Sequence, residues 1–134
     1  MNVVIDSNIL FSLLWSKNSP LREVLFDKSY KFHAPHYLFV ELFKHKERLM
    51  QNTKNQSSEV YEYLYKILNK IQFHNENIID LSTKKQAYLL CKDQDIYDVP
   101  FVALALALDA YLWTGDKKLI KHLQKLGFNN VFIY

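Results

Sequence analysis

The sequence has very little cysteine and no long hydrophobic run, and these absences exclude several classes of protein. The single cysteine, Cys91, excludes an intrachain disulfide and is typical of a reducing compartment. One cysteine and five scattered histidines show no spacing suited to zinc ligands. The longest apolar run, Val99 to Leu108, is far too short to cross a bilayer, and the N-terminus has an acid at Asp6 and no basic leader, so it is not a signal peptide. We therefore expect a soluble, cytoplasmic protein that does not associate with membranes.

The sequence also lacks a linker, an internal repeat and a low-complexity segment. Its 134 residues suit one domain over residues 1–134, which is large enough to bury a core. Hydrophobic residues make up 49% and charged residues 23%, which argues against disorder. The formal net charge of +3 comes from 17 Lys and Arg against 14 Asp and Glu, and by itself it indicates no particular partner.

Short apolar segments alternate along the chain between strand-like and helix-like patterns. The patterns predict strands over residues 1–5, 31–34, 77–80, 111–113 and 131–133. They predict helices over residues 8–15, 20–25, 36–50, 60–71, 83–90, 99–108 and 119–126. The strands are apolar throughout rather than alternating, which indicates an α/β fold with a parallel sheet covered on both faces.

Local signals mark several boundaries of these elements. Ser19-Pro20 reads as an N-cap followed by proline in the first turn, and Pro35 is expected to stop the second strand. Thr83 with Gln86 resembles a capping box, and Gly127 is expected to end the last helix. Polar residues 51–58 make a turn between two helices, which together predict an αα-hairpin.

Four acidic residues stand where apolar segments end or are interrupted. Asp6 follows the first strand, Glu41 interrupts an apolar stretch, Asp98 opens the run that starts at Val99, and Asp116 closes the segment that starts at Tyr111. Carboxylates are rarely placed next to a core unless their charge is compensated. If these segments pack together, the acids converge, and like charges at close range need protons or cations. A divalent metal ion with oxygen ligands would meet that need.

A parallel sheet gives a reason for the acids to meet. Ligands of open α/β sheets bind beyond the carboxyl ends of the strands, where the strand order reverses. Asp6 and Asp116 both lie just past a strand, and adjacent strands would place them roughly 5 Å apart. Asp98 begins the buried helix that leads into the second of these strands, and the helix of Glu41 must face the sheet.

Each acid taken alone also fits a structural role. Asp6, Asp98 and Asp116 could cap the helices that follow them. Glu41 could pair with Lys44 or His45 one turn away on the helix surface. Four such placements together favour a cluster instead, and small oxygen-bearing side chains stand beside the acids: Ser7, Asn8 and Thr114.

With these residues assembled, the chain resembles the PIN-domain family of metal-dependent nucleases. The segment VVIDSNIL resembles the family's opening strand followed by Asp, Ser or Thr, and Asn. Glu41 falls at the family's second acid, and DQDIYDVPFVALALALDAYLWTGDKKL resembles its third and fourth acids around a buried helix. The match runs from Met1 to about Val131. The resemblance implies a three-layer α/β/α sandwich with a central parallel sheet, and an endonuclease that hydrolyses single-stranded RNA with Mg²⁺ or Mn²⁺.

The resemblance implies that Asp6, Glu41, Asp98 and Asp116 are the catalytic, metal-binding acids. Asp93, Asp95 and Asp98 lie close together, and any of them could be the third acid. Asp98 is favoured because it stands at the mouth of the buried helix, where the family has its acid, whereas Asp95 is expected to be exposed or to support the ligands.

Phosphodiester hydrolysis suits such a cluster, because two hard cations about 3.5–4 Å apart can clamp the attacking and leaving oxygens. Mg²⁺ and Mn²⁺ prefer carboxylate oxygen and water. We expect Asp6 and Asp98 to be the main ligands, with Asp116 and Glu41 completing the shell. Asn8 and Thr114 should orient the carboxylates or the attacking water, as groups behind metal ligands do. One ion or two remain equally open.

Basic residues offer contacts for a phosphate backbone. Without the four site acids, ten acids remain against 17 bases, and a basic body around an acidic pocket suits a polyanion. Lys117 and Lys118 are the candidates for binding substrate because they follow Asp116 directly. The other lysines read more simply as solvated helix faces.

Other functions fit the sequence less well. A haloacid-dehalogenase-like phosphatase needs a second Asp two residues after the first, where this chain has Asn8, and the acidic pair and lysine of a phospho-receiver domain are not evident. The remaining alternative is a catalytically silent PIN-like scaffold that binds RNA or protein.

Small free-standing PIN proteins are often toxins of toxin–antitoxin pairs, similar to the VapC type, so an antitoxin partner is a candidate. A homodimer is another, because the predicted αα-hairpin is rich in aromatic residues that could form an interface: Tyr37, Phe39, Phe43, Tyr61, Tyr63 and Tyr65. The RNA target, the partner and the oligomeric state stay open.

Overall fold

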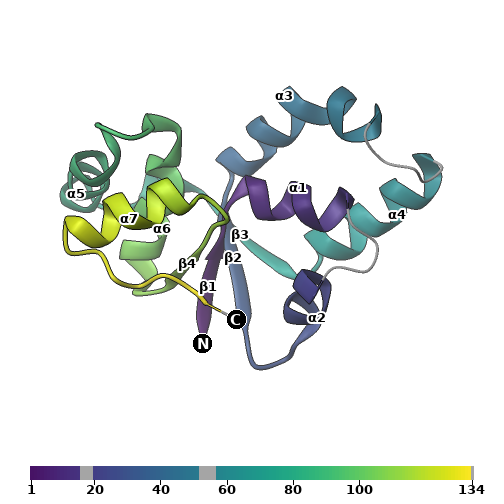
Figure 1. The fold of residues 1–134 in the computed structure, drawn as a ribbon, viewed down its shortest axis with the longest axis horizontal. Coiled ribbons are helices and arrows are strands. Elements are labelled where there is room, and N and C mark those ends of the chain that lie inside the picture. Colours follow the sequence, from purple (N-terminus) through teal and green to yellow (C-terminus); the bar gives the residue numbers. More distant parts are fainter. Residues whose placement is uncertain (16–19, 52–56, 134) are drawn as a thin grey trace.

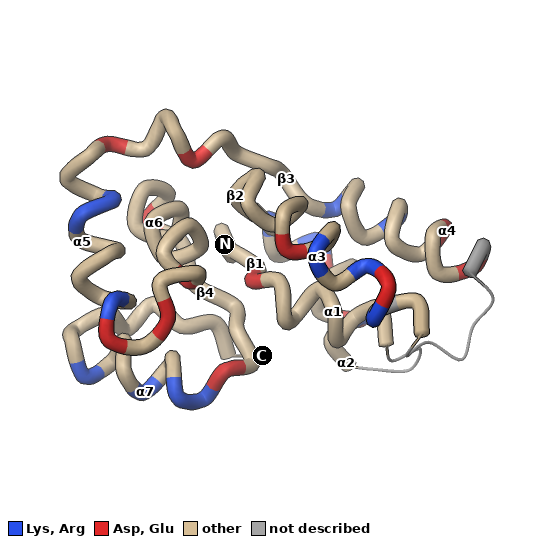
Figure 2. Tube along the Cα trace, turned by 90° about the horizontal axis from the view of Figure 1, so that it is seen from above, with Lys and Arg blue, Asp and Glu red and all other residues tan. Residues whose placement is uncertain are grey.

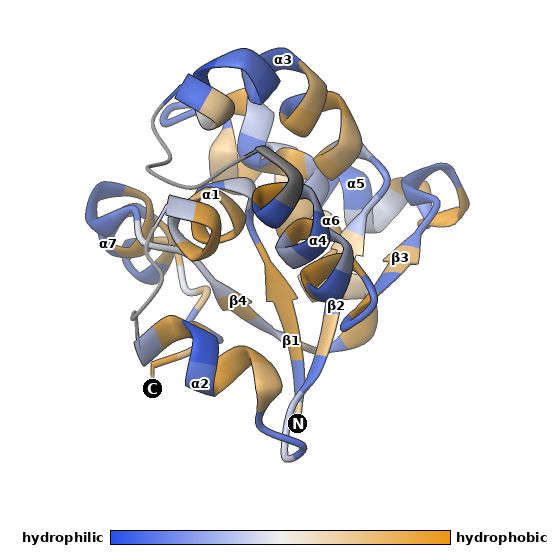
Figure 3. Cartoon of the chain, turned by 90° about the vertical axis from the view of Figure 1, so that its right-hand side faces the viewer, coloured by the Kyte–Doolittle hydropathy of each residue, from blue (hydrophilic) through white to orange (hydrophobic). Residues whose placement is uncertain are grey.

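A sheet of parallel strands lies at the centre of the computed structural model, which describes residues 1–15, 20–51 and 57–133 (Figure 1). The strands are β1 Asn2–Ile5, β2 Lys31–Pro35, β3 Ile71–His74 and β4 Tyr111–Trp113. Their order is β3-β2-β1-β4, and every pairing is parallel. Val3, Val4 and Ile5 have no exposed surface, so β1 is the hydrophobic centre of the sheet, as its colour in Figure 3 shows.

Helices cover both faces of this sheet. They are α1 Ser7–Trp15, α2 Pro20–Phe26, α3 Tyr37–Gln51, α4 Ser57–Leu68, α5 Leu81–Cys91, α6 Val99–Leu108 and α7 Lys117–Lys125, with short 3₁₀ turns η1 Glu76–Ile78 and η2 Ile96–Asp98. In Figure 1, α1 to α4 lie on one side of the strands and α5 to α7 on the other. The predicted three-layer α/β/α sandwich is therefore confirmed. No helix within the described ranges is long and apolar enough to cross a membrane.

Helix α6 explains why a sequence without a polar face can still be a helix. It packs against β1 and β2 on one side and against α5 on the other, and residues 101–105 are all buried. A helix covered in this way has no solvent side over those residues, so apolar residues occupy its whole circumference. It ends at Asp109, whose φ of 49° is the left-handed conformation of a helix C-cap.

The predicted third strand was wrong in position. Residues 77–80 were expected to be a strand, but the third strand is β3, and residues 76–78 form the 3₁₀ turn η1. Asn75 explains the turn, because its side chain accepts a hydrogen bond of 3.0 Å from the Asn77 N–H. Ile71 lies at helical spacing from Ile67, which extended the predicted helix too far. The chain instead leaves α4 at Leu68, and Ile71 pairs with Phe32.

Three other predicted boundaries differ in the structure. Pro35 is the last residue of β2 rather than a stop before it, and it lies beyond His33, the last residue of β2 that pairs with β1, so its missing N–H is tolerated. Helix α5 starts at Leu81 and contains Thr83, so the capping box is absent there. Residues 131–133 form only a single bridge, from Val131 to Leu112, instead of a strand.

The remaining helices and strands lie close to their predicted positions. Helix α2 begins at Pro20 as expected, whereas Ser19 and most of the predicted turn at 51–58 lie outside the described residues. Gly127 follows α7 with a φ of 94°, a conformation that side chains disfavour and glycine accepts freely.

A hydrogen-bonded polar chain links three strands of the sheet. His33 in β2 is 6% exposed, and its Nε2 lies 3.0 Å from Asn2 Oδ1 in β1, while its Nδ1 lies 2.9 Å from His74 Nε2 in β3. The Asn2 carbonyl oxygen can only accept, so His33 Nε2 donates and His33 Nδ1 accepts from His74. Burial lowers the pKa of His33, which favours the neutral ring that this pattern needs.

Candidate active site

Asp6 and Asp116 lie at the carboxyl ends of two neighbouring strands, β1 and β4. The chain runs outward from β1 through β2 to β3 and then returns to the other side of β1 at β4, so the strand order reverses between these two strands. The Asp6 N–H donates to the Trp113 carbonyl at 3.1 Å and continues the β1–β4 pairing past Ile5. The two strands are adjacent, which is the condition under which the sequence places these acids side by side, and this edge is where open α/β sheets bind ligands.

Asp6 is held against the core by two hydrogen bonds. Its side chain is only 5% exposed, and Oδ1 accepts from the Ile9 N–H at 2.9 Å, which caps α1. The Thr114 hydroxyl donates to the same carboxylate. Burial nevertheless raises the pKa of Asp6 to about 6, and the negative charges of Glu41 and Asp116 add to the rise. Asp6 therefore caps a helix, and its two hydrogen bonds do not fully offset the cost of burying its charge.

Asp98 is the most perturbed carboxylate at this edge. It precedes α6 in the N-cap position, yet among the described residues its side chain makes no capping hydrogen bond. Burial raises its pKa to about 7, followed by repulsion from Asp95, Asp6, Asp116 and Glu41 in that order. Helix capping therefore does not account for Asp98, and its carboxylate faces the charges of the other acids.

Glu41 reaches the site from α3. It is half-buried, and burial is the main cause that raises its pKa, while repulsion from Asp95 adds to it. The Ser7 hydroxyl donates to its carboxylate, and the positive charges of His45 and Lys44 lower the pKa. The cations of its own helix and the acid Asp95 therefore act on the pKa of Glu41 in opposite directions.

Thr114 joins the two strand-end acids. The Asp116 N–H donates to Thr114 Oγ1 at 3.1 Å, while the Thr114 hydroxyl donates to Asp6. The Asp116 carboxylate caps α7 by accepting from the N–H groups of Lys118 and Leu119 at 3.0 and 3.1 Å. A small buried hydroxyl is the side chain that can donate to one acid and accept from the backbone of the other.

The remaining predicted site residues are exposed. Asp95 is exposed and accepts a hydrogen bond from the Tyr97 N–H at 2.9 Å, and Asn8 is exposed in the first turn of α1. Lys117 and Lys118 are exposed at the start of α7. Figure 2 shows further basic residues along α7 and in the second half of α3, on either side of the acids.

The side chains at this edge are of the kind that binds a hard divalent cation, but they do not form a complete coordination shell among the described residues. Every predicted ligand offers carboxylate oxygen. The raised pKa values of Asp6 and Asp98 indicate that their negative charges are unfavourable here, and a bound cation would compensate them. Across the described residues, no three His, Cys, Asp or Glu side chains are close enough together to ligate one ion. The acids thus interact through their charges without forming a finished coordination shell.

Two tyrosines at this edge were not predicted as site residues. Lys44 donates to the Tyr37 hydroxyl, and its Nζ lies 5.0 Å from the centroid of the Tyr97 ring. The signal in the sequence was the spacing of Tyr37, Glu41 and Lys44, which places all three on one face of α3. Tyr97 gave no signal, because only the fold brings η2 next to α3.

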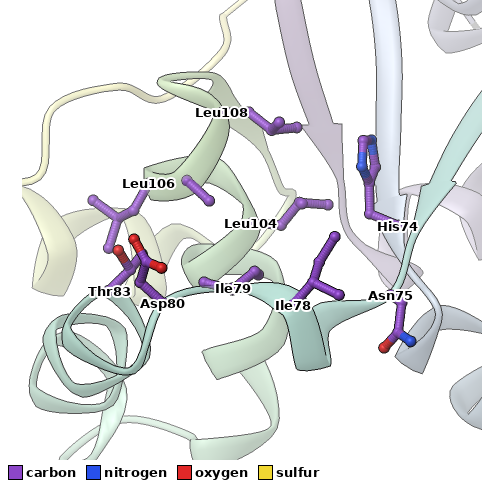
Figure 4. A pocket seen from close by; sticks show the side chains of 10 residues that line it. His74, Asn75, Ile78, Ile79, Asp80, Thr83, Leu104, Leu106 and Leu108 are labelled. Atoms are coloured by element: carbon purple, nitrogen blue, oxygen red, sulfur yellow. The ribbon is translucent and has the colours of Figure 1, made fainter.

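Two cavities near the sheet are separate from the acids. A mostly apolar cavity of about 370 Å³ includes Thr114 and Lys117 in its wall, and one of about 310 Å³ lies between β3, α5 and α6. In the second cavity, Asp80 and Thr83 lie together at one side and His74 at the other, with leucine and isoleucine side chains between them (Figure 4). None of the four predicted catalytic acids lines either cavity.

Comparison with known proteins agrees with this arrangement. The chain matches the PIN domain over residues 4–130 and belongs to the PIN-domain family. Its fold is similar to that of a solved structure of VapBC-1 from nontypeable Haemophilus influenzae, with a TM-score of 0.61 and 20% identity, over 93% of this chain and 94% of that chain. No match was found among curated protein sequences.

The raised pKa of Asp98 predicts how stability depends on pH when divalent cations are removed with EDTA. Asp98 binds its proton more tightly in the folded state, at a pKa of about 7 against 3.8, so ionisation destabilises the fold as the pH rises through this range. Asp98→Asn should therefore gain stability over the wild type as the pH rises, reaching roughly 5 °C in melting temperature near pH 8.

The comparison of the two proteins isolates Asp98 from other titrating groups. His33 and His74 have lowered pKa values and change stability in the opposite direction, but they do so in both proteins alike. Asp93→Asn is the matched control, because Asp93 is an exposed aspartate near Asp98 and should show no growing difference. A constant difference between Asp98→Asn and wild type across this pH range would contradict the placement of Asp98 among the acids.

Proposed function

We propose that this protein is an endonuclease that hydrolyses phosphodiester bonds of single-stranded RNA with Mg²⁺ or Mn²⁺. The observation that carries the proposal is the pair of acids Asp6 and Asp98, both raised in pKa by burial and by the charges around them. Carboxylates held close to the core at the reversal of a parallel sheet are costly unless a ligand compensates them. Membership of the PIN-domain family, which comprises metal-dependent nucleases, supports this reading.

Asp6 and Asp98 would hold the cation, with Asp116 and Glu41 completing the shell directly or through water. The bound cation supplies charge stabilisation for the phosphorane-like transition state and lowers the pKa of water. Thr114 and Ser7 keep Asp6 and Glu41 in place, since each hydroxyl donates to one carboxylate. Because Asp6 and Asp98 must lose their protons to act as ligands, activity should rise with pH through about 6 to 7.

A catalytically silent scaffold that binds RNA or protein is the second candidate. One observation favours it: in the part of the chain that the structure describes, no three potential ligands are preformed around one ion. Against it, all four family acids are present, and Asp98 makes no capping hydrogen bond that would explain its place. The two candidates differ in whether the carboxylates are needed for more than folding.

Replacing either main ligand should therefore abolish cleavage without unfolding the protein. Asp6→Asn and Asp98→Asn remove a carboxylate charge but keep a side chain of the same shape, and Asn can still cap α1 at position 6. We expect RNA cleavage to fall at least about 100-fold in each, with melting temperatures equal to or above that of wild type. The control is Asp93→Asn. Full activity in Asp6→Asn or Asp98→Asn would contradict the assignment of that residue as a metal ligand and leave the scaffold as the better candidate.

Divalent cations should raise the melting temperature, because an ion that binds only the native state stabilises it by mass action. Millimolar Mg²⁺ or Mn²⁺ is expected to stabilise the wild type. Asp116→Asn should blunt the effect strongly, and Asp95→Asn should do so less, since Asp95 is exposed and already bonded to the Tyr97 N–H. An equal loss in both variants would mean that Asp95 belongs to the ligand shell.

We further propose that the protein is the toxin of a toxin–antitoxin pair, held inactive by a small partner protein. Small PIN proteins similar to the VapC type often have this role, and the fold similarity to VapBC-1 supports the same type. The predicted αα-hairpin gives a docking surface for such a partner. Phe43, Tyr61 and Tyr65 are 71%, 46% and 68% exposed, so these aromatic residues do not all pack in the core.

The docking surface is an apolar groove of about 250 Å³ between α3 and α4. Its walls come from both helices and its floor from α1: Leu14, Phe39, Leu42, Phe43, Lys46, Met50, Val60, Tyr61, Leu64 and Leu68. An amphipathic helix lays its apolar face into a groove of this kind. Lys46 of α3 lines this groove, so the partner helix should carry an acidic residue along its edge.

Phe43→Asp should weaken binding of this partner without changing the nuclease activity. A charge placed in an apolar groove removes a large contact and leaves an unpaired carboxylate in the interface, which costs about 2 kcal/mol, or roughly 30-fold in affinity. The measurement is co-purification and calorimetry with the product of the neighbouring gene. Tyr88→Asp is the control, since Tyr88 is 51% exposed on α5, in the other helical layer. A protein that is harmless alone, monomeric and binds no neighbour would contradict the toxin role, and dimerisation that Phe43→Asp disrupts would assign the groove to a second copy.

A further inference from the structure

Lys44 and Tyr97 form a cation–aromatic pair at the rim of the acid cluster. Lys44 Nζ lies 5.0 Å from the centroid of the Tyr97 ring, and 54% of the Tyr97 side chain is exposed. The pair joins α3 to η2, two segments far apart in the sequence. The Asp95 carboxylate accepts a hydrogen bond from the Tyr97 N–H at 2.9 Å, which fixes the backbone from which the ring extends.

The same pair is anchored on the core by Tyr37. Lys44 donates to the Tyr37 hydroxyl, and the Tyr37 ring packs edge-on against Phe101 of the buried helix α6, at 6.4 Å between centroids. Tyr37 therefore holds the Lys44 ammonium near the Tyr97 ring, and both Lys44 and Tyr97 are exposed.

The acids stand directly beside the pair. Glu41 precedes Lys44 by one helical turn, and the charge of Lys44 acts on the Glu41 carboxylate. Asp98 follows Tyr97 in the chain, and both belong to η2. A chain that crosses the acids in this direction would therefore meet the Tyr97 ring and the Lys44 ammonium.

We propose that Tyr97 and Lys44 form a nucleotide subsite, in which the Tyr97 ring stacks on a base next to the scissile phosphate and Lys44 contacts a backbone phosphate. The proposal rests on the nuclease function proposed above and names the feature of its substrate that the rim recognises. Exposed aromatic rings combined with cations are how proteins bind single strands, because every base has a face that can stack. Double-stranded RNA keeps its bases inside the helix, so this subsite selects unpaired RNA.

Binding of a short single-stranded RNA with one 2-aminopurine base, measured in EDTA so that no cleavage occurs, tests the subsite. Tyr97→Ala should weaken binding roughly 5- to 50-fold and lose the quenching that stacking causes, whereas Tyr97→Phe should keep both. Lys44→Gln should reduce the salt dependence of binding by about one phosphate contact. The controls are Tyr65→Ala and Lys66→Gln, two exposed residues on α4.

The outcomes separate this proposal from the nuclease function. Binding by Tyr97→Ala equal to that of wild type, or a wild type that does not bind the oligonucleotide, would overturn the subsite. If Tyr97→Ala binds weakly but Asp98→Asn still cleaves RNA, the subsite stands and the catalytic assignment fails. Melting curves of Tyr97→Ala and Tyr97→Phe show that a lost interaction is not a lost fold.

Discussion

The carboxylate of Asp6 sits almost completely buried at the end of the most buried strand of the sheet. Two neighbours compensate it in part, the Ile9 N–H and the Thr114 hydroxyl, yet its pKa still rises to about 6. Three further acids reach the same edge from α3, η2 and the loop after β4, and their charges act on one another. This repulsion is the constraint on which the site depends, because the fold keeps negative charges together that would separate in an unfolded chain.

Three of the four acids also interact with the helices that carry or follow them. Asp6 caps α1, Asp116 caps α7, and Glu41 interacts with cations on its own helix. Capping fixes the Asp6 and Asp116 carboxylates at the N-termini of their helices, where negative charge is favourable. Asp98 differs, since no capping bond among the described residues accounts for it. Burial and the charges of the other acids, rather than a capping bond, therefore determine the environment of Asp98.

Some features could be predicted from the sequence and others could not. Local composition predicts strand β1, the buried helix α6 and the acids at the ends of their segments. A short apolar run that ends at a polar residue fits few structures other than a buried strand or helix. The position of β3 was wrong, since Ile71 fits both a helix and a strand pattern, and only its pairing with Phe32 decides between them. The capping box at Thr83 and the last strand at 131–133 failed for the same reason, because short patterns do not specify which segment they pack against.

By itself, the sequence determined that four acids flank apolar segments, that the fold is α/β and that the chain resembles the PIN-domain family. Those features depend on residue types and spacing, which every copy of the chain carries before it folds. Only the tertiary structure decided that β4 lies next to β1, that Thr114 bonds to both strand-end acids, and that Tyr97 meets Lys44. These contacts join segments that are far apart in the sequence. Local patterns do not show which distant segments meet, because strand order depends on which faces can be buried together.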